Sequence, residues 1–129
     1  MDSYARSFEE DINSKPESAK YLVDFAFYSS IGDIDKACSV IQLNLQNMSG
    51  VWKNLAASCL KSYRFDIAIK ALQSMGYSHS VLKMQSVIND PEYNKEAIAA
   101  TLAGQLGKPF IKHAVHLYEK AGRWDLLNL

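Results

Sequence analysis

The chain has 129 residues, and its 14 basic and 14 acidic side chains cancel to give a pI near 6.8. A nucleic-acid-binding protein normally carries a basic face, because phosphate contacts supply most of its affinity. The hydrophobic fraction of 48% and the charged fraction of 22% are typical of a folded domain. We therefore expect a folded protein that binds no nucleic acid. We also expect no membrane insertion, because its apolar runs are too short to span a bilayer.

The two cysteines, Cys38 and Cys59, lie among apolar neighbours at helical spacing. A disulfide-stapled secreted domain would need more cysteines than this. The segment Met1–Tyr4 shows no apolar signal sequence. The pattern predicts two reduced thiols in the core of a cytoplasmic protein.

Residues 1–15 are polar and mixed in charge, and we expect a partly flexible lead-in with a short helix around Phe8 and Ile12. Ser14, Pro16 and Glu17 then form a helix-start signal. A hydroxyl can cap free N–H groups, proline fits the first turn, and an acid favours the positive end of the helix dipole.

Apolar residues recur at helical spacing through the rest of the chain, and no alternating strand pattern is found. Gly32 and Gly122 are predicted to end helices, Asp33 to cap the next one, and Pro91 to terminate another. Short loops between successive helices predict antiparallel neighbours. The predicted helices span about residues 16–30, 34–44, 51–62, 67–75, 79–88, 92–106 and 110–121.

A repeat underlies these helices. Tyr21 and Trp52 open equivalent helices 31 residues apart, and Ala37 and Ala68 share the same separation in the partner helices. The spacing of aromatic, leucine and small residues resembles the tetratricopeptide pattern. The positions that match are Tyr21, Ala37, Trp52, Leu55, Ala56, Ala68, Leu72, Ala114 and Tyr118. Residues 16–129 are therefore predicted to be an all-α solenoid of antiparallel helix pairs, degenerate in repeat sequence and part of a longer solenoid.

No set of side chains predicts catalysis, a cofactor, a small-molecule substrate or a metal. His113 and His116 share a helix face, but a zinc site needs three or four ligands and no others lie at suitable spacing. Cys59 has no neighbouring base to activate it as a nucleophile. We expect surface or interface histidines and a structural thiol.

Two carboxylate pairs, Asp33/Asp35 and Asp90/Glu92, also stand near predicted helix starts. Paired carboxylates in a glycosidase-like site must face each other across a cleft in different environments. At a helix start, acids instead cap free N–H groups and favour the dipole. Capping is the interpretation that we prefer for both pairs.

The last residues are the candidates for partner contact. Arg123 and Trp124 open what the pattern predicts to be a further helix, followed by Leu126 and Leu127. Trp and Arg are frequent anchors of protein interfaces. An uncovered end repeat would leave these side chains exposed.

Several segments resemble the family of 140-kilodalton subunits of intraflagellar transport complex A, in the region where its helical repeats begin. The likeness covers about residues 20–129 and is strongest around Trp52. The segments that carry it are Phe27–Ala37, Val51–Ala56, Leu60–Ala68, Leu72–Tyr77, Leu102–Gly107 and Leu117–Lys120.

The resemblance implies a non-catalytic scaffold in the cilium and at its base, supporting retrograde transport. Its implied partners are the other helical-repeat subunits of the same complex. The alternative is a helical-repeat segment of a vesicle coat or another trafficking assembly, since those proteins share the helix-pair pattern.

Overall fold

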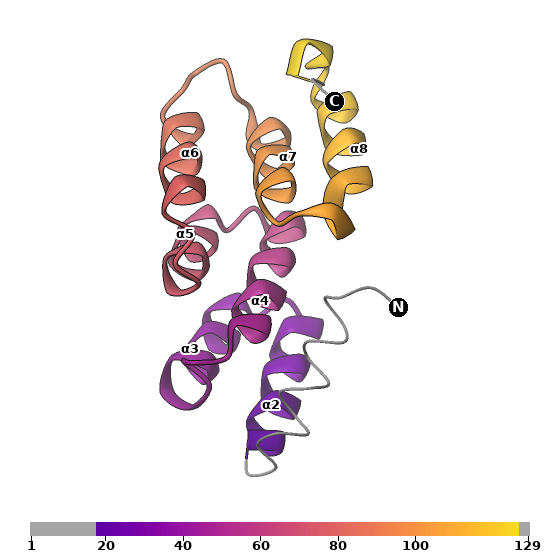
Figure 1. The fold of residues 1–129 in the computed structure, drawn as a ribbon. Helices are drawn as coiled ribbons and strands as arrows, with labels where there is room; N and C mark the ends of the chain where they lie inside the picture. Colours follow the sequence, from indigo (N-terminus) through magenta and orange to yellow (C-terminus); the bar gives the residue numbers. More distant parts are fainter. Residues whose placement is uncertain (1–17, 127–129) are drawn as a thin grey trace.

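The computed structural model describes residues 18–126, which form helices joined by short turns and contain no strand (Figure 1). The prediction of an all-α helical repeat is confirmed. The predicted lead-in, the start signal at Ser14–Glu17 and Leu127 lie outside the described residues. The elements are α2 (Ala19–Ser30), α3 (Ile34–Asn44), α4 (Ser49–Ser62), α5 (Phe65–Ser74), α6 (Ser78–Ile88), α7 (Lys95–Gln105), η2 (Lys108–Phe110), α8 (Ile111–Ala121) and η3 (Trp124–Leu126).

The helices pack most extensively as the pairs α2/α3, α4/α5 and α7/α8. Figure 1 shows the pairs following one another from α2/α3 at one end to α7/α8 at the other. Helix α6 is the additional element, and it contacts α5 on one side and α7 on the other. Helix α4 also contacts both α2 and α7, so the first helices of successive pairs lie beside one another.

Local signals place the start of α3 as predicted. Gly32 adopts a φ of +80°, which a residue without Cβ tolerates, and the chain reverses there. The Asp33 carboxylate then accepts a hydrogen bond from the Lys36 backbone N–H at 3.2 Å. This contact satisfies one of the free donors at the helix start.

Three predicted boundaries were wrong. Helix α5 begins at Phe65, although residues 65 and 66 were predicted to lie in a turn. Helix α4 begins at Ser49, and Gly50, which was assigned to a break, is helical and buried. Helix α7 begins at Lys95 because the Asn94 side chain caps the Ala97 N–H at 2.9 Å. Asp90 accepts from the Glu92 N–H within the preceding turn, so this carboxylate pair does not cap a helix.

Trp52 is the largest side chain in the core, with 2% of its surface exposed. Its ring nitrogen donates to the Gln46 carbonyl at 2.8 Å, so the polar atom of the indole is satisfied. Such a residue combines a large apolar surface with one directed hydrogen bond. This hydrogen bond connects α4 to the loop that precedes it.

Alanines allow the helices to approach closely. Ala37 and Ala68 are fully buried in the main core. Every residue from Ala97 to Ala103 is buried, because α4, α6 and α8 all contact α7. Four of these seven residues are alanine, and their small side chains leave room for the neighbouring helices.

Replacing Trp52 with alanine should lower the free energy of unfolding by about 3–5 kcal/mol, because it empties a large core site and leaves the Gln46 carbonyl without its donor. Urea unfolding followed by circular dichroism measures this loss. Trp124→Ala is the matched control, since that ring is 65% exposed; it should change stability by less than about 0.5 kcal/mol. A loss below about 1 kcal/mol for Trp52→Ala would contradict the packing described.

Enlarging Ala68 should also lower the free energy of unfolding, in this case by overfilling the core. Ala68→Leu inserts methyl groups into a filled helix contact and should cost about 1–3 kcal/mol in thermal or urea unfolding. Ala26→Leu, on the exposed side of α2, makes the same chemical change where there is space. Equal stability of the two variants would show that Ala68 does not lie at a close contact.

Candidate protein-binding groove

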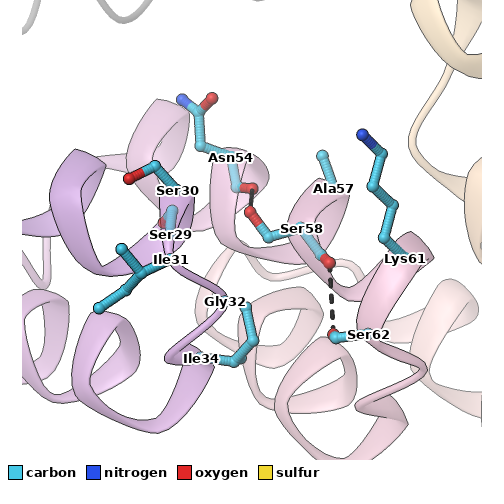
Figure 2. A pocket seen from close by; sticks show the side chains of 10 residues that line it. All are labelled: Ser29, Ser30, Ile31, Gly32, Ile34, Asn54, Ala57, Ser58, Lys61 and Ser62. Carbon is cyan, nitrogen blue, oxygen red and sulfur yellow. Dashed lines mark hydrogen bonds between the residues drawn. The ribbon is translucent and has the colours of Figure 1, made fainter.

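A groove of about 620 Å³ lies between the end of α2 and the outer side of α4 (Figure 2). The turn Ser29–Gly32 forms one wall, and Ile34 extends it into α3. The other wall comes from α4, with Ala57 and Lys61 among its residues. The groove therefore joins two successive helix pairs.

Three polar side chains of α4 line the groove in a row: Asn54, Ser58 and Ser62. Their spacing of four residues places them on one face of the helix, while Leu55 and Cys59 are turned into the core. Ser58 donates to the Asn54 carbonyl at 3.2 Å, and Ser62 donates to the Ser58 carbonyl at 3.3 Å, as Figure 2 shows.

These hydrogen bonds determine what the groove can offer to a ligand. Asn54 donates its amide nitrogen to the Gly50 carbonyl at 2.9 Å, and Ser30 donates to the Phe27 carbonyl at 2.7 Å. A hydroxyl that has donated its proton still has lone pairs, and an amide keeps its carbonyl oxygen. The groove therefore offers hydrogen-bond acceptors from its hydroxyl and amide oxygens, and donors from the second N–H of Asn54 and from Lys61.

The hydroxyl oxygen of Ser29 is the exception in this set. It is buried and has no hydrogen-bond partner within residues 18–126. Leaving a polar atom unpaired is unfavourable, and such atoms are uncommon in folded proteins. Ser29 is among the residues that line the groove, but its hydroxyl oxygen is covered by the protein.

Lys61 gives the groove its charge. No acidic side chain of residues 18–126 lines the groove, and Lys61 forms no ion pair within that range. It lies in the last turn of α4, where the helix dipole favours a cation. The groove therefore carries one positive charge that its described lining does not neutralise.

An ionic cluster beside the groove connects the first two helix pairs. Arg64 donates to Asp35 at 3.0 and 2.8 Å and to Asp66 at 3.2 and 3.1 Å. These hydrogen bonds lower the pKa of both carboxyl groups below the ordinary value of 3.8. We call these three side chains the Arg64 clamp. The clamp joins the start of α3 to the start of α5.

This cluster was not predicted, because the position of Asp35 in the sequence indicates only an acid at a helix start. A sequence signal exists: the Arg-aromatic-Asp order of residues 64–66 returns at residues 123–125. Arg123 likewise donates to Asp125, with both distances 3.0 Å. It also contacts the Glu92 carbonyl and lies 5.2 Å from the centre of the Tyr93 ring.

The candidate contact residues at the end of the chain therefore differ in accessibility. Arg123 is engaged within the protein, whereas Trp124 is largely exposed. Leu126 is partly buried. The predicted further helix appears over Trp124–Leu126 as one turn of 3₁₀ helix. The contact of these residues with a partner stays a prediction.

Of the positions assigned to the repeat, Tyr21 and Tyr118 are only partly buried. The Tyr118 hydroxyl lies 3.1 Å from that of Thr101, which links α8 to α7. Their assignment as repeat-defining positions stays a prediction. The other members are buried: Ala37, Trp52, Leu55, Ala56, Ala68, Leu72 and Ala114.

Both cysteines are free and buried. Burial raises the pKa of the Cys59 thiol to about 12, so it is protonated and unreactive at neutral pH. Within residues 18–126, no three His, Cys, Asp or Glu side chains gather in a way that could hold a metal ion. The same range contains no helix whose length and hydropathy would let it cross a membrane.

Comparison with known families places most of the chain in one of them. A family model matches residues 32–129, and it describes the tetratricopeptide-repeat (TPR) domain of the intraflagellar transport proteins 140 and 172. The match begins at the turn after α2 and includes the helices from α3 to α8.

The Arg64 clamp should make stability depend on acidic pH. The folded protein lowers the pKa of Asp35 and Asp66. Their contribution to the free energy of unfolding is therefore fully present when the pH is above their ordinary pKa of 3.8. It is lost as the pH falls through the lower folded values, since protonation removes the negative charge. Arg64→Gln should therefore lose less free energy of unfolding than the native protein between about pH 5 and about pH 2.5.

Urea unfolding at several pH values measures that difference. Lys53→Gln also removes one cation, but Lys53 forms no ion pair among the described residues, so its pH dependence should match the native protein. An identical pH dependence for Arg64→Gln would show that the clamp does not contribute to folding.

Proposed function

This chain belongs to the TPR domain family of the intraflagellar transport proteins 140 and 172, and from that membership we propose that it is a non-catalytic scaffold segment of intraflagellar transport complex A. In this function it supports retrograde transport in the cilium and at its base. Its partners are the other helical-repeat subunits of the complex. The observation that carries the proposal is the family match over residues 32–129, together with the likeness to complex A subunits around Trp52.

The surface is suited to binding other proteins. Large apolar side chains are exposed along α2 and just after its end, at Val23, Phe27 and Ile31. Exposed apolar surface of this kind favours protein contact where it is contiguous.

Trp124 is the second surface feature that supports this function. Its ring is 65% exposed beside Arg123, and Arg123 is already held by Asp125 and Tyr93. An aromatic ring next to an ordered cation is a suitable anchor for a partner. We assign Arg123, Trp124, Leu126 and Leu127 to one contact surface with a neighbouring helical-repeat subunit.

Affinity purification of the tagged chain from ciliated cells tests the scaffold function. The expected result is recovery of complex A subunits and localisation to the cilium base. Trp124→Ala should reduce this recovery, whereas Leu43→Ala, at an exposed position of α3 remote in sequence, should leave it unchanged. Recovery of vesicle-coat subunits, with localisation to the Golgi or endosomes, would contradict the proposal and favour the trafficking alternative.

A further inference from the structure

We propose that residues 4–12 form a helix that folds back antiparallel to α2 and covers an exposed apolar stripe on that helix. The stripe consists of Val23, Phe27 and Ile31. Four observations carry the proposal: the exposure of the stripe, the matching apolar pattern of residues 4–12, the short connection to α2, and the opposite charges of the two parts.

The stripe is a row of apolar side chains on the side of α2 that faces away from the core, and it ends just past the helix. Val23, Phe27 and Ile31 are 67%, 56% and 59% exposed, whereas Leu22 and Phe25 are turned inward. A spacing of four residues aligns the exposed side chains over about 12 Å. Single exposed apolar residues are ordinary, but a row of them marks a contact surface. The helices within residues 18–126 leave this row uncovered.

The segment before α2 has an apolar row of the same spacing and length. Residues 4–12 lie outside the described part of the chain, and Tyr4, Phe8 and Ile12 stand four residues apart in their sequence. In a helix these three side chains would share one side, and most of the remaining positions are polar. An antiparallel helix would place Ile12 near the start of the stripe and Tyr4 near its end. Its polar side would face solvent, as the end of a solenoid requires.

The connection between this segment and α2 is short. Residues 13–18 join the two, and connections of about two to eight residues are typical of antiparallel helices that pack together. A segment tethered in this way meets the stripe at an effective concentration on the order of millimolar. A small apolar contact is therefore enough to hold it.

A second copy of the chain or a separate protein suits the stripe less well. A stable interface buries roughly 800 Å² on each partner, which is more than three side chains expose. An independent partner also loses translational and rotational freedom on binding, and the tethered segment avoids most of that cost. The size of the stripe therefore favours an occupant from the same chain.

Charge favours the same arrangement. Residues 1–17 contain five acidic and two basic side chains, so their net charge is −3, and the neutrality of the whole chain leaves +3 on residues 18–129. Lys20 is exposed three residues before Val23, which places it beside the stripe. It lies 4.8 Å from the centre of the Tyr21 ring and forms no ion pair among the described residues. The three consecutive acids of residues 9–11 would lie near it in the antiparallel arrangement.

The covered stripe changes what the chain presents to other proteins. In the free chain the segment occupies the stripe, and a protein that binds to Phe27 must first displace it. This inference goes beyond the scaffold function, and its tests require no subunit of complex A.

Thiol labelling measures how accessible the stripe is, because both native cysteines are buried. Val23→Cys introduces an accessible thiol into the full chain. Its rate of reaction with a maleimide should rise at least about fivefold when Phe8→Glu and Ile12→Glu are added, because charges on the apolar row would detach the segment. Ser3→Glu and Asn13→Glu add the same charge at positions off that row and should leave the rate unchanged.

Leu43→Cys, on α3, is the control for the probe itself. Leu43 is 81% exposed, and the labelling rate of this thiol should respond to neither pair of glutamates. Circular dichroism confirms that each variant is folded. An equal rate for Val23→Cys with and without the glutamates at positions 8 and 12 would overturn the proposal. Protection of Val23→Cys that increases with protein concentration would also overturn it, by assigning the stripe to a second copy.

Disulfide formation tests the direction of the segment. Under mild oxidation of the full chain, Tyr4→Cys should pair with Ile31→Cys at least about fivefold faster than with Val23→Cys, because only the antiparallel arrangement brings positions 4 and 31 within bonding distance. Mass spectrometry identifies the linked residues. An unordered segment would react slightly faster with Val23→Cys, since that loop is shorter. Equal rates, or a faster reaction with Val23→Cys, would overturn the antiparallel arrangement.

Discussion

The close approach of helices through alanine is the constraint on which the rest of this structure depends. Ala37 and Ala68 are fully buried, one in the second helix of each of the first two pairs. In α7 the run Ala97–Ala103 is buried on all sides, so the helix accepts α4, α6 and α8 together. Helix pairs of this size bury too little apolar surface alone, and stacking supplies the remainder. Larger side chains at these positions would separate the pairs.

This packing explains why α4 presents two chemically different faces. Leu55 and Cys59 fill the core, and their burial fixes the rotation of the helix about its axis. Asn54, Ser58 and Ser62 are then directed to the groove. The polar face is a consequence of the apolar one, because both follow from the period of the same helix.

The Arg64 clamp acts between the same two helix pairs, at the starts of α3 and α5. Arg64 holds one carboxylate from each of the first two helix pairs, although all three groups are near solvent. Exposed ion pairs contribute little to stability, but a forked guanidinium between two carboxylates restricts their geometry. The clamp is therefore best understood as a constraint on how α3 and α5 are aligned, and through them on the groove between α2 and α4.

The sequence by itself determined the all-helical repeat fold and the family, because helix signals are local and the repeat spacing is visible along the chain. Gly32 and Asp33 set the start of α3, and the spacing of Trp52, Leu55 and Ala56 identified a tetratricopeptide-like pair. The sequence was less precise at α7: the helix was predicted to begin near residue 92 with Asp90 and Glu92 at its start, whereas Asn94 caps it.

Only the tertiary structure decided which side chains meet. Arg64 and Asp35 are 29 residues apart, and nothing in either local segment requires their contact. The groove and the unpartnered Ser29 hydroxyl within residues 18–126 likewise exist only once α2 and α4 are stacked. Local sequence fixes backbone conformation through nearby atoms, whereas a site between helices depends on how their apolar faces are rotated and packed together.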